Sequence, residues 1–304
     1  MLFLIYINDL HTAIKHSNVI HFADDTSLIN CNKSLKTINL QINEDLKLLC
    51  EWLRANKICL NTNKTEIIIF RSKQKSTISK KLNFRISGQK IKPSLKVTYL
   101  GVVFDQFLTW NDHFNILLPK LSRATGMLAK IRYFVPYETL CSIYHAIFNS
   151  HLTYSSLIWG YITEELKNRI QVLQNKALRI IHFKKQRESA GPLYFKSNIL
   201  PINDQIKLQH CLLALDHQRK LLPTAFRDFF VPIHNIHKHK TKSAVIKLNV
   251  PGTKTKTCGT FSIKTQAAIC WNTIIPSIQI CLFNSSKSLL KKKLQEILIN
   301  KHNQ

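Results

Sequence analysis

The sequence has few acidic residues and many basic ones. Its 304 residues include 17 Asp and Glu against 44 Lys and Arg, which gives a formal net charge of +27. This excess would destabilise a compact state through self-repulsion unless a polyanion or counterions screened it. Nucleic acid is the favoured polyanion, because phosphates attract Lys and Arg with little regard for base sequence. The alternative is that an acidic partner or a further segment balances the charge.

Paired cysteines and long apolar runs are also missing. The 8 cysteines are scattered and form no C-x-x-C pair, which argues against a zinc ribbon and a secreted disulfide framework. No stretch is long and apolar enough to span a bilayer. The apolar start, MLFLIYINDL, lacks a basic leader and a small-residue cleavage site, so it does not match a signal peptide. We therefore expect an intracellular protein with reduced thiols and no membrane partner, in the nucleus or the cytoplasm.

The first hundred residues predict short strands around one helix. Apolar runs at 19–22 and 26–29 flank Ala23-Asp24-Asp25 and predict a β-hairpin. Ser34, followed by an apolar stripe at helical spacing, predicts a capped helix. Further β-structure is expected as a buried strand at 67–70, a hairpin at 82–92 turning at Ser87-Gly88-Gln89, and a strand at 96–105 in which Gly101 allows close backbone approach.

From about residue 109 the patterns are helical. Phe114, Leu117, Leu118, Leu121, Thr125 and Leu128 share one helical face, and Pro119 should kink or restart that helix. Residues 138–158 and 164–182 predict further amphipathic helices, and 286–299 a Lys-rich one. The region after about 225 is loop-rich and basic, and its His234, His237 and His239 suit a nucleic-acid loop better than a metal site. This order predicts an α+β fold with boundaries near 108 and 225.

Two adjacent carboxylates, Asp24 and Asp25, stand at the tip of the first predicted hairpin. Aspartates at a β-turn are most simply explained by turn geometry. In a strongly basic chain they also suit phosphoryl transfer to a nucleic acid, because Mg²⁺ prefers carboxylate oxygens on a rigid hairpin. Two such ions about 4 Å apart can activate a primer hydroxyl and stabilise the departing pyrophosphate.

The motifs resemble those of one enzyme family in type and in order. Phe22-Ala23-Asp24-Asp25 resembles the [YF]-x-D-D box of reverse transcriptases, and the whole set is most similar to the Jockey-like group of LINE (non-LTR) retrotransposons. The other matching segments are LFLIYINDL (2–10, the helix after the ILGP motif), WLRANKICLNTNKTEIIIF (52–70, motif D), VTYLGVVFDQFLTW (97–110, primer grip), LSRATGMLAKIRYFVP (121–136) and NSHLTYSSLIWG (149–160, thumb), and CGTFSIKTQAAICWNTIIPSIQ (258–279, the tail after the polymerase).

This resemblance implies roles for single residues. Asp24 would be a principal metal ligand and Asp25 the assisting carboxylate at a site for two Mg²⁺ ions. Lys64 corresponds to the motif D lysine, which would protonate the leaving pyrophosphate or neutralise its charge. Tyr99 and Gly101 would belong to the primer-grip turn. The plainer alternatives are an exposed loop lysine for Lys64 and a core strand for the other two residues.

The resemblance also implies a nucleic-acid surface and a division of the chain. Lys120, Arg123, Lys130 and Arg132 would face the minor groove or the phosphates of an RNA–DNA hybrid, although a solvated helix face is the alternative. The implied partners are an RNA template and a DNA primer. We expect a partial polymerase palm at 1–108, a helical thumb at 109–225 and a basic C-terminal region at 226–304.

Two parts of the family's pattern have no counterpart in the sequence. They are the fingers and the first catalytic aspartate, for which only Asp9 of the ordinary NDL pattern is available. Two carboxylates bind Mg²⁺ weakly, because this ion prefers octahedral sites with several anionic ligands. We therefore expect a truncated reverse transcriptase that is inactive alone or active with the missing N-terminal half in trans. The alternative is a module that binds RNA or hybrid without chemistry.

Overall fold

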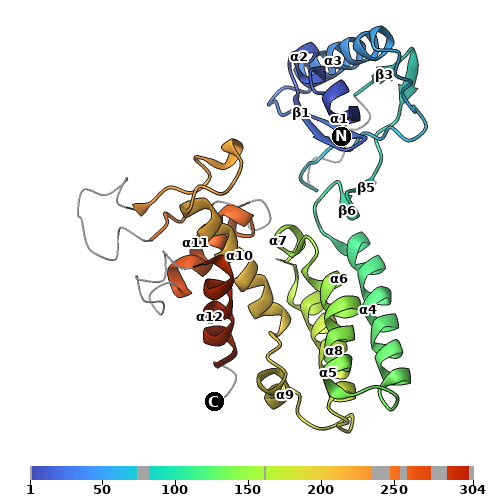
Figure 1. Cartoon of the computed structure of the whole chain (residues 1–304). Helices are drawn as coiled ribbons and strands as arrows, with labels where there is room; N and C mark the ends of the chain where they lie inside the picture. Colours follow the sequence, from blue (N-terminus) through green and yellow to red (C-terminus); the bar gives the residue numbers. More distant parts are fainter. Residues whose placement is uncertain are drawn as a thin grey trace. The chain divides into compact units, whose positions relative to one another are not determined.

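The computed structural model describes residues 2–73, 82–160, 162–233, 247–253, 259–274 and 286–300. They form two compact units, unit 1 (Met1–Asp112) and unit 2 (His113–Gln304) (Figure 1). His234, His237 and His239 lie outside the described residues, as do parts of the segment 258–279. None of the described helices combines the length and the apolar composition needed to cross a bilayer.

The described part of unit 1 combines two short helices and one long helix with three small sheets. Its elements in chain order are α1 (Leu2–Tyr6), α2 (Leu10–Ala13), β1 (Asn18–Phe22), β2 (Asp25–Ile29), α3 (Leu35–Ala55), β3 (Phe84–Ile86), β4 (Gln89–Ile91), β5 (Lys96–Tyr99) and β6 (Val102–Asp105). Each sheet is an antiparallel pair of consecutive strands, β1 with β2, β3 with β4 and β5 with β6. The hairpins predicted at 19–29 and 82–92 are therefore confirmed.

Two expectations for the strands of unit 1 are wrong. The segment 96–105 is a hairpin rather than one strand, because Leu100 and Gly101 have φ values of 47° and 76° and reverse the chain between β5 and β6. In the segment 67–70 the three isoleucines are half-buried, Phe70 is exposed, and the only described pairing is an isolated bridge between Ile68 and Ser94. Its side chains pack beside the core without a partner strand to continue the ladder.

The core of unit 1 lies between α3 and the hairpins. Ser34 caps α3 as predicted, because its Oγ accepts a hydrogen bond from the Thr37 backbone N–H at 3.4 Å. The buried members of this core are Leu10, Ile14, Leu46, Leu49, Leu53, Leu82, Phe84 and Ile86. The apolar face of α3 thus packs against the β3–β4 hairpin.

Unit 2 is helical. Its elements in chain order are α4 (Asn111–Ile131, beginning in the last residues of unit 1), α5 (Tyr137–Tyr144), the π-helix η2 (His145–Asn149), α6 (Ser150–Thr153), α7 (Ser156–Trp159), α8 (Glu164–Ile181), α9 (Gly191–Lys196), α10 (Ile202–Gln218), the 3₁₀ turn η3 (Thr224–Phe226), α11 (Ile263–Ile274) and α12 (Lys287–Asn300). The long helices α4 and α8 run beside each other (Figure 1).

The apolar face predicted for α4 is confirmed. All six of its predicted members are buried, and Pro119 lies inside one continuous helix. The helix expected at 138–158 is instead interrupted, first by η2 and then at Ser155, whose φ of 53° separates α6 from α7. This break lets Trp159 turn into the interior, where it is 0% exposed.

A hydrophobic core of unit 2 forms around α10, α11 and α12. It includes Trp271 of α11 and Leu294 of α12 together with Leu215 of α10. Residues from both sides of position 225 therefore share one core. The helix α12 was predicted, whereas α11 lies in a segment that the sequence indicated to be loop-rich. With its helices and small antiparallel sheets, the chain is α+β.

Candidate functional site

The β1–β2 hairpin presents the two adjacent aspartates. Phe22 pairs with Asp25, so Ala23 and Asp24 form the connecting turn. Ala23 has a φ of 53°, a left-handed conformation that tight hairpin turns require. The side chains of Asp24 and Asp25 are exposed and make no hydrogen bond or ion pair to the described part of the chain. The structure thus presents two bare carboxylates in an accessible turn.

The donor set at this turn is incomplete for a magnesium centre. Among the residues that the structure describes, no group of three or more His, Cys, Asp or Glu side chains is close enough to share an ion. Asp9 directly precedes α2, and its backbone carbonyl accepts from Thr12. Since Mg²⁺ needs near-octahedral oxygen coordination, Asp24 and Asp25 do not by themselves fit the two-ion centre that the sequence suggests.

Lys64 lies in a polar turn of unit 1. Its backbone N–H donates to the Asn61 carbonyl at 3.2 Å, and its side chain is exposed. No hydrogen bond or ion pair in the described part of unit 1 joins Lys64 to Asp24 or Asp25. Its role in pyrophosphate release stays a prediction.

Tyr99 precedes the β5–β6 turn, and Gly101 lies within it. Tyr99 pairs with Val102, and Leu100 and Gly101 fill the two turn positions that require positive φ. The turn is followed by a carboxylate cap, since Asp105 Oδ1 accepts from the backbone N–H of Thr109 at 2.7 Å and of Trp110 at 2.9 Å. This cap fixes the chain where it enters α4. The segment forms a tight turn, and its contact with a primer stays a prediction.

Three of the predicted cationic residues lie on the outer face of α4. Lys120, Arg123 and Lys130 are exposed, opposite the buried apolar face. None of them makes an ion pair with a described carboxylate. Burial, with the positive charge of Lys120, lowers the pKa of His113 on the same helix, which favours its neutral form. Arg132, just beyond the helix, is half-buried and lies over aromatic rings.

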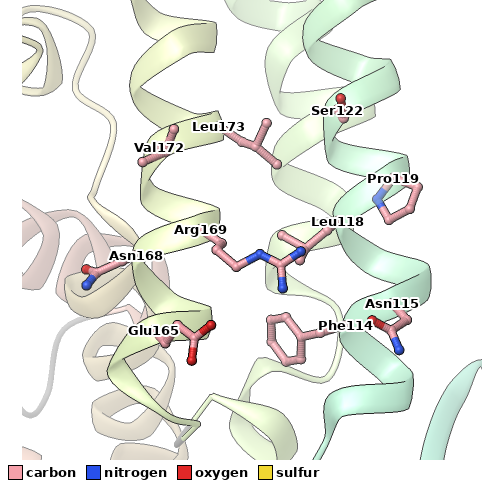
Figure 2. Close-up of a pocket in the computed structure, with 10 residues that line it drawn as sticks. All are labelled: Phe114, Asn115, Leu118, Pro119, Ser122, Glu165, Asn168, Arg169, Val172 and Leu173. Carbon is pink, nitrogen blue, oxygen red and sulfur yellow. The ribbon is translucent and has the colours of Figure 1, made fainter.

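A groove of about 810 Å³ separates α4 from α8 (Figure 2). Phe114, Leu118 and Leu173 supply apolar walls, and the Arg169 side chain extends between the two helices. Glu165 and Asn168 lie on the α8 side. The groove lies within unit 2, and none of the catalytic, metal-binding or nucleic-acid-binding residues predicted from the sequence lines it.

The sequence reasoning missed one cluster. Tyr133 and Phe183 are exposed and pack against each other, with Arg132 over both rings. The sequence feature that points to this cluster is a pair of runs that mix aromatic and basic residues, RYF at 132–134 and FKK at 183–185. Their meeting required the tertiary structure, because 50 residues separate them.

Comparison with known proteins gives a consistent set of relatives. The chain is 24% identical over 220 residues to the "Probable RNA-directed DNA polymerase from transposon BS" of Drosophila melanogaster, an alignment that covers 66% of this chain and 23% of that protein. It is 25% identical over 179 residues to the RNA-directed DNA polymerase from mobile element jockey of Drosophila funebris, covering 58% and 18%. The chain is similar to the RNA-directed DNA polymerases of mobile elements.

A further polymerase relative supports this likeness. The "Probable RNA-directed DNA polymerase from transposon X-element" of Drosophila melanogaster is 26% identical over 134 residues, which cover 43% of the chain and 14% of the relative. The predicted resemblance to Jockey-like retrotransposon polymerases is thereby confirmed. The chain spans less than a quarter of the length of these relatives. No protein-family model and no solved structure matches it.

Proposed function

We propose that this chain is part of an RNA-directed DNA polymerase of a non-LTR retrotransposon. Unit 1 corresponds in this proposal to a portion of the catalytic palm, and α4 to the start of a thumb that holds an RNA–DNA hybrid. The observation that carries the proposal is the exposed Asp24-Asp25 turn of the β1–β2 hairpin in a chain similar to such polymerases. The hairpin presents both carboxylates to solvent, where metal-bound nucleotide can approach.

Residues 1–304 alone do not polymerise in this proposal. Two carboxylates without a third acidic ligand among the described residues give too weak a hold on Mg²⁺. Unit 1 also exposes apolar side chains that suit contact with another protein segment, namely Leu2 (85% exposed), Ile5 (69%) and Phe22 (60%). A polypeptide carrying the fingers and the first catalytic aspartate would complete the enzyme by packing on these residues.

Primer extension tests this assignment. The purified 304-residue chain should give no product on an RNA template with Mg²⁺ or Mn²⁺. Extension should appear when a polypeptide with the fingers and the first catalytic aspartate of a jockey-type polymerase is added. That activity should vanish in Asp24→Asn, which removes the charge but keeps the shape of the side chain.

Asp112→Asn is the matched control for this experiment. Asp112 is another aspartate of unit 1, but it pairs with Lys96 at 3.0 Å, so its substitution should leave the complemented activity intact. Extension by the chain alone that is lost in Asp24→Asn would show that the described carboxylates suffice. Complemented extension that survives in Asp24→Asn would remove Asp24 from the reaction.

A second function, nucleic-acid binding without chemistry, is favoured by the charge distribution. The chain has a formal net charge of +27, and α4 displays Lys120, Arg123 and Lys130 without described ion-pair partners. Binding to phosphates releases counterions, so affinity should fall steeply with salt. We expect a log–log slope of roughly −4 to −8 if about 5 to 9 phosphates are contacted.

Filter binding across a salt series tests this second function. Changing Lys120, Arg123 and Lys130 together to Ala should weaken binding to an RNA–DNA hybrid and flatten the slope by about 1 to 3 units. The matched control changes Lys291, Lys292 and Lys293 of α12 to Ala, which removes the same charge from another helix of unit 2. Equal slopes for the two triple variants would place the contact away from α4.

A further inference from the structure

An exposed aromatic cluster lies at one end of unit 2, where the chain leaves α4 and α8. We define the aromatic tip as residues 130–137 and 182–188. The rings of Tyr133 and Phe183 lie 5.7 Å apart at an interplanar angle of 58°. Tyr133 is 69% exposed, Phe183 is 51% exposed and the neighbouring Phe134 is 84% exposed. Single exposed apolar residues are common, but three aromatic side chains in one place form a patch that needs an explanation.

The backbone holds these rings outward. The helix α8 closes with hydrogen bonds from the Phe183 N–H to the Ile180 carbonyl and from the Lys184 N–H to the Arg179 carbonyl, at 3.2 and 2.8 Å. Phe183 occupies the left-handed position that ends such helices, with a φ of 55°. Glycine is preferred there, and a bulky ring is disfavoured. Phe183 therefore lies at the end of α8, where it is 51% exposed.

Arg132 joins the two rings. Its guanidinium carbon lies 4.4 Å from the centre of the Tyr133 ring and 5.7 Å from that of Phe183. It also donates a hydrogen bond to the Tyr133 hydroxyl. A guanidinium carries five N–H donors in one plane, so this bond leaves others able to hold a phosphate. The cation therefore orients the rings and places positive charge at their edge.

The charge around the rings is one-sided. Five basic residues lie in the aromatic tip, against the Glu138 that directly follows it and one carboxylate within it, Glu188. That carboxylate is already engaged, since it pairs with Lys184 at 3.0 Å and accepts from the Lys185 backbone N–H at 2.7 Å. Burial, together with the charges of Lys196 and Lys184, lowers the pKa of His182, which agrees with a positive potential here.

The geometry points to a stacking platform for the unpaired bases of single-stranded nucleic acid, formed by Tyr133 and Phe183 with phosphates held by Arg132 and its basic neighbours. Exposed aromatic faces beside a basic surface are the combination that binds single strands, because every base has a face that can stack. A double helix hides those faces, so the platform would select a single-stranded stretch beside a duplex. This inference rests on the proposed nucleic-acid binding by unit 2 and adds a second, base-dependent contact to it.

The contribution of stacking can be separated from that of charge by removing the aromatic rings from the protein and the bases from the oligonucleotide. The protein variant is Tyr133→Leu with Phe183→Leu, which keeps apolar side chains but removes the aromatic faces. The probes are a labelled oligouridylate and an oligomer of equal length whose bases are replaced by abasic residues. Fluorescence anisotropy gives the affinity of each protein for each probe. Tyr154→Leu, at an exposed tyrosine between α6 and α7, serves as control.

The ratio of the affinities for oligouridylate and for the abasic probe is the quantity that decides. It should fall in the double variant by about 5- to 150-fold for one stacked base, while the salt slope and the melting temperature stay as in the unchanged chain. The control should keep the full ratio. An unchanged ratio in a folded double variant would overturn the stacking platform while leaving the charge-based binding in place. Absence of any binding by the unchanged chain would overturn both the platform and the proposed nucleic-acid function.

Discussion

Unit 1 and unit 2 both contain a buried core, but they differ in where large apolar side chains stay exposed, on α1 and the β1–β2 hairpin in unit 1 and on a surface that includes the aromatic tip in unit 2. In unit 2, Trp159, Trp271, Phe114 and Phe148 are at most 1% exposed. In unit 1, the described helix α1 leaves Leu2 and Ile5 largely exposed, and the outer side of the β1–β2 hairpin leaves Phe22 exposed. A closed core stabilises a helical unit by itself, whereas small two-stranded sheets are marginal without further cover.

The two units also satisfy their buried polar groups differently. Unit 1 uses carboxylates that accept from backbone N–H groups, as Asp45 does from Lys15 and His16 at 3.1 Å each. Unit 2 uses a neutral network, in which Gln174 donates to the Tyr144 hydroxyl and the Leu200 carbonyl. Unit 2 thus encloses its largest side chains in closed cores, whereas unit 1 carries its paired aspartates on a two-stranded hairpin with exposed apolar neighbours.

The largest effect is expected from a cavity in the core of unit 2. Trp159 packs edge-on against Phe114, with ring centres 5.4 Å apart, and its indole N–H donates to the Tyr154 carbonyl at 2.8 Å. Trp159→Ala should lower the unfolding free energy of unit 2 by about 3–5 kcal/mol. Denaturant titration followed by pulsed hydrogen exchange, which reports each unit separately, would measure this loss.

The neighbouring Ile158→Ala variant calibrates that loss. Ile158 lies on the same helix but is 40% exposed, so its truncation should cost less than about 1 kcal/mol. Amide protection in unit 1 should stay the same in both variants. Loss of protection in both units for Trp159→Ala would break the comparison, because it would make the two units one cooperative body.

A smaller effect is expected at the carboxylate cap of unit 1. Asp105 is 7% exposed and accepts from three backbone N–H groups, those of Phe107, Thr109 and Trp110. Asp105→Ala should cost about 2–3 kcal/mol, because it leaves buried donors without an acceptor. Thermal unfolding monitored by hydrogen exchange in unit 1 would measure this cost.

Asp112→Ala provides the contrast on the same segment. Its ion pair with Lys96 is exposed, with side-chain exposures of 38% and 58%. Exposed pairs contribute between about 0 and 1 kcal/mol, so this variant should be close to neutral. Equal costs for the two substitutions would show that Asp105 acts by charge alone and not through its three backbone N–H donors.

The smallest difference between the units should appear on mild acidification. Burial lowers the pKa of four histidines of unit 2, namely His113, His145, His182 and His210. Below the ordinary value of 6.5 the unfolded chain takes up protons that the folded unit does not, so the stability of unit 2 should fall as pH decreases through this range. Urea midpoints at about pH 7.5 and about pH 5.5 would record the change.

Unit 1 should respond less over the same pH range. Burial and the charge of His11 also lower the pKa of His21 in unit 1. The pKa of Glu44 lies below its ordinary value of 4.5, because His16 and Lys15 donate hydrogen bonds to it. The stability from Glu44 is therefore lost only at lower pH. His113→Gln should reduce the pH dependence of unit 2. A larger acid response in unit 1 than in unit 2 would reverse the comparison.

Much of the local structure was predictable from short-range patterns. The Ser34 cap, the buried face of α4 and the β1–β2 hairpin follow from side-chain spacing and turn preferences that act within a few residues. The exposed position of Lys120 follows from the same spacing. These features depend on neighbours along the chain, so the sequence contains the needed information.

The errors occurred where long-range packing outweighs local preference. The segment 67–70 has strand composition, yet it forms only one bridge because no second strand continues the ladder beside it. The helix expected at 138–158 is broken at Ser155, which places Trp159 in the interior of unit 2. In each case the preferred local conformation is altered by the burial that packing allows.

The sequence by itself determined the basic charge, the order of the polymerase-like motifs and the pair of adjacent aspartates. Only the tertiary structure decided that Trp159 turns into the interior of unit 2, and that Tyr133 and Phe183 meet. The physical reason is distance along the chain. Charge and turn preference are properties of neighbouring residues, whereas a metal site or an aromatic cluster needs side chains from distant segments, and packing alone brings those together.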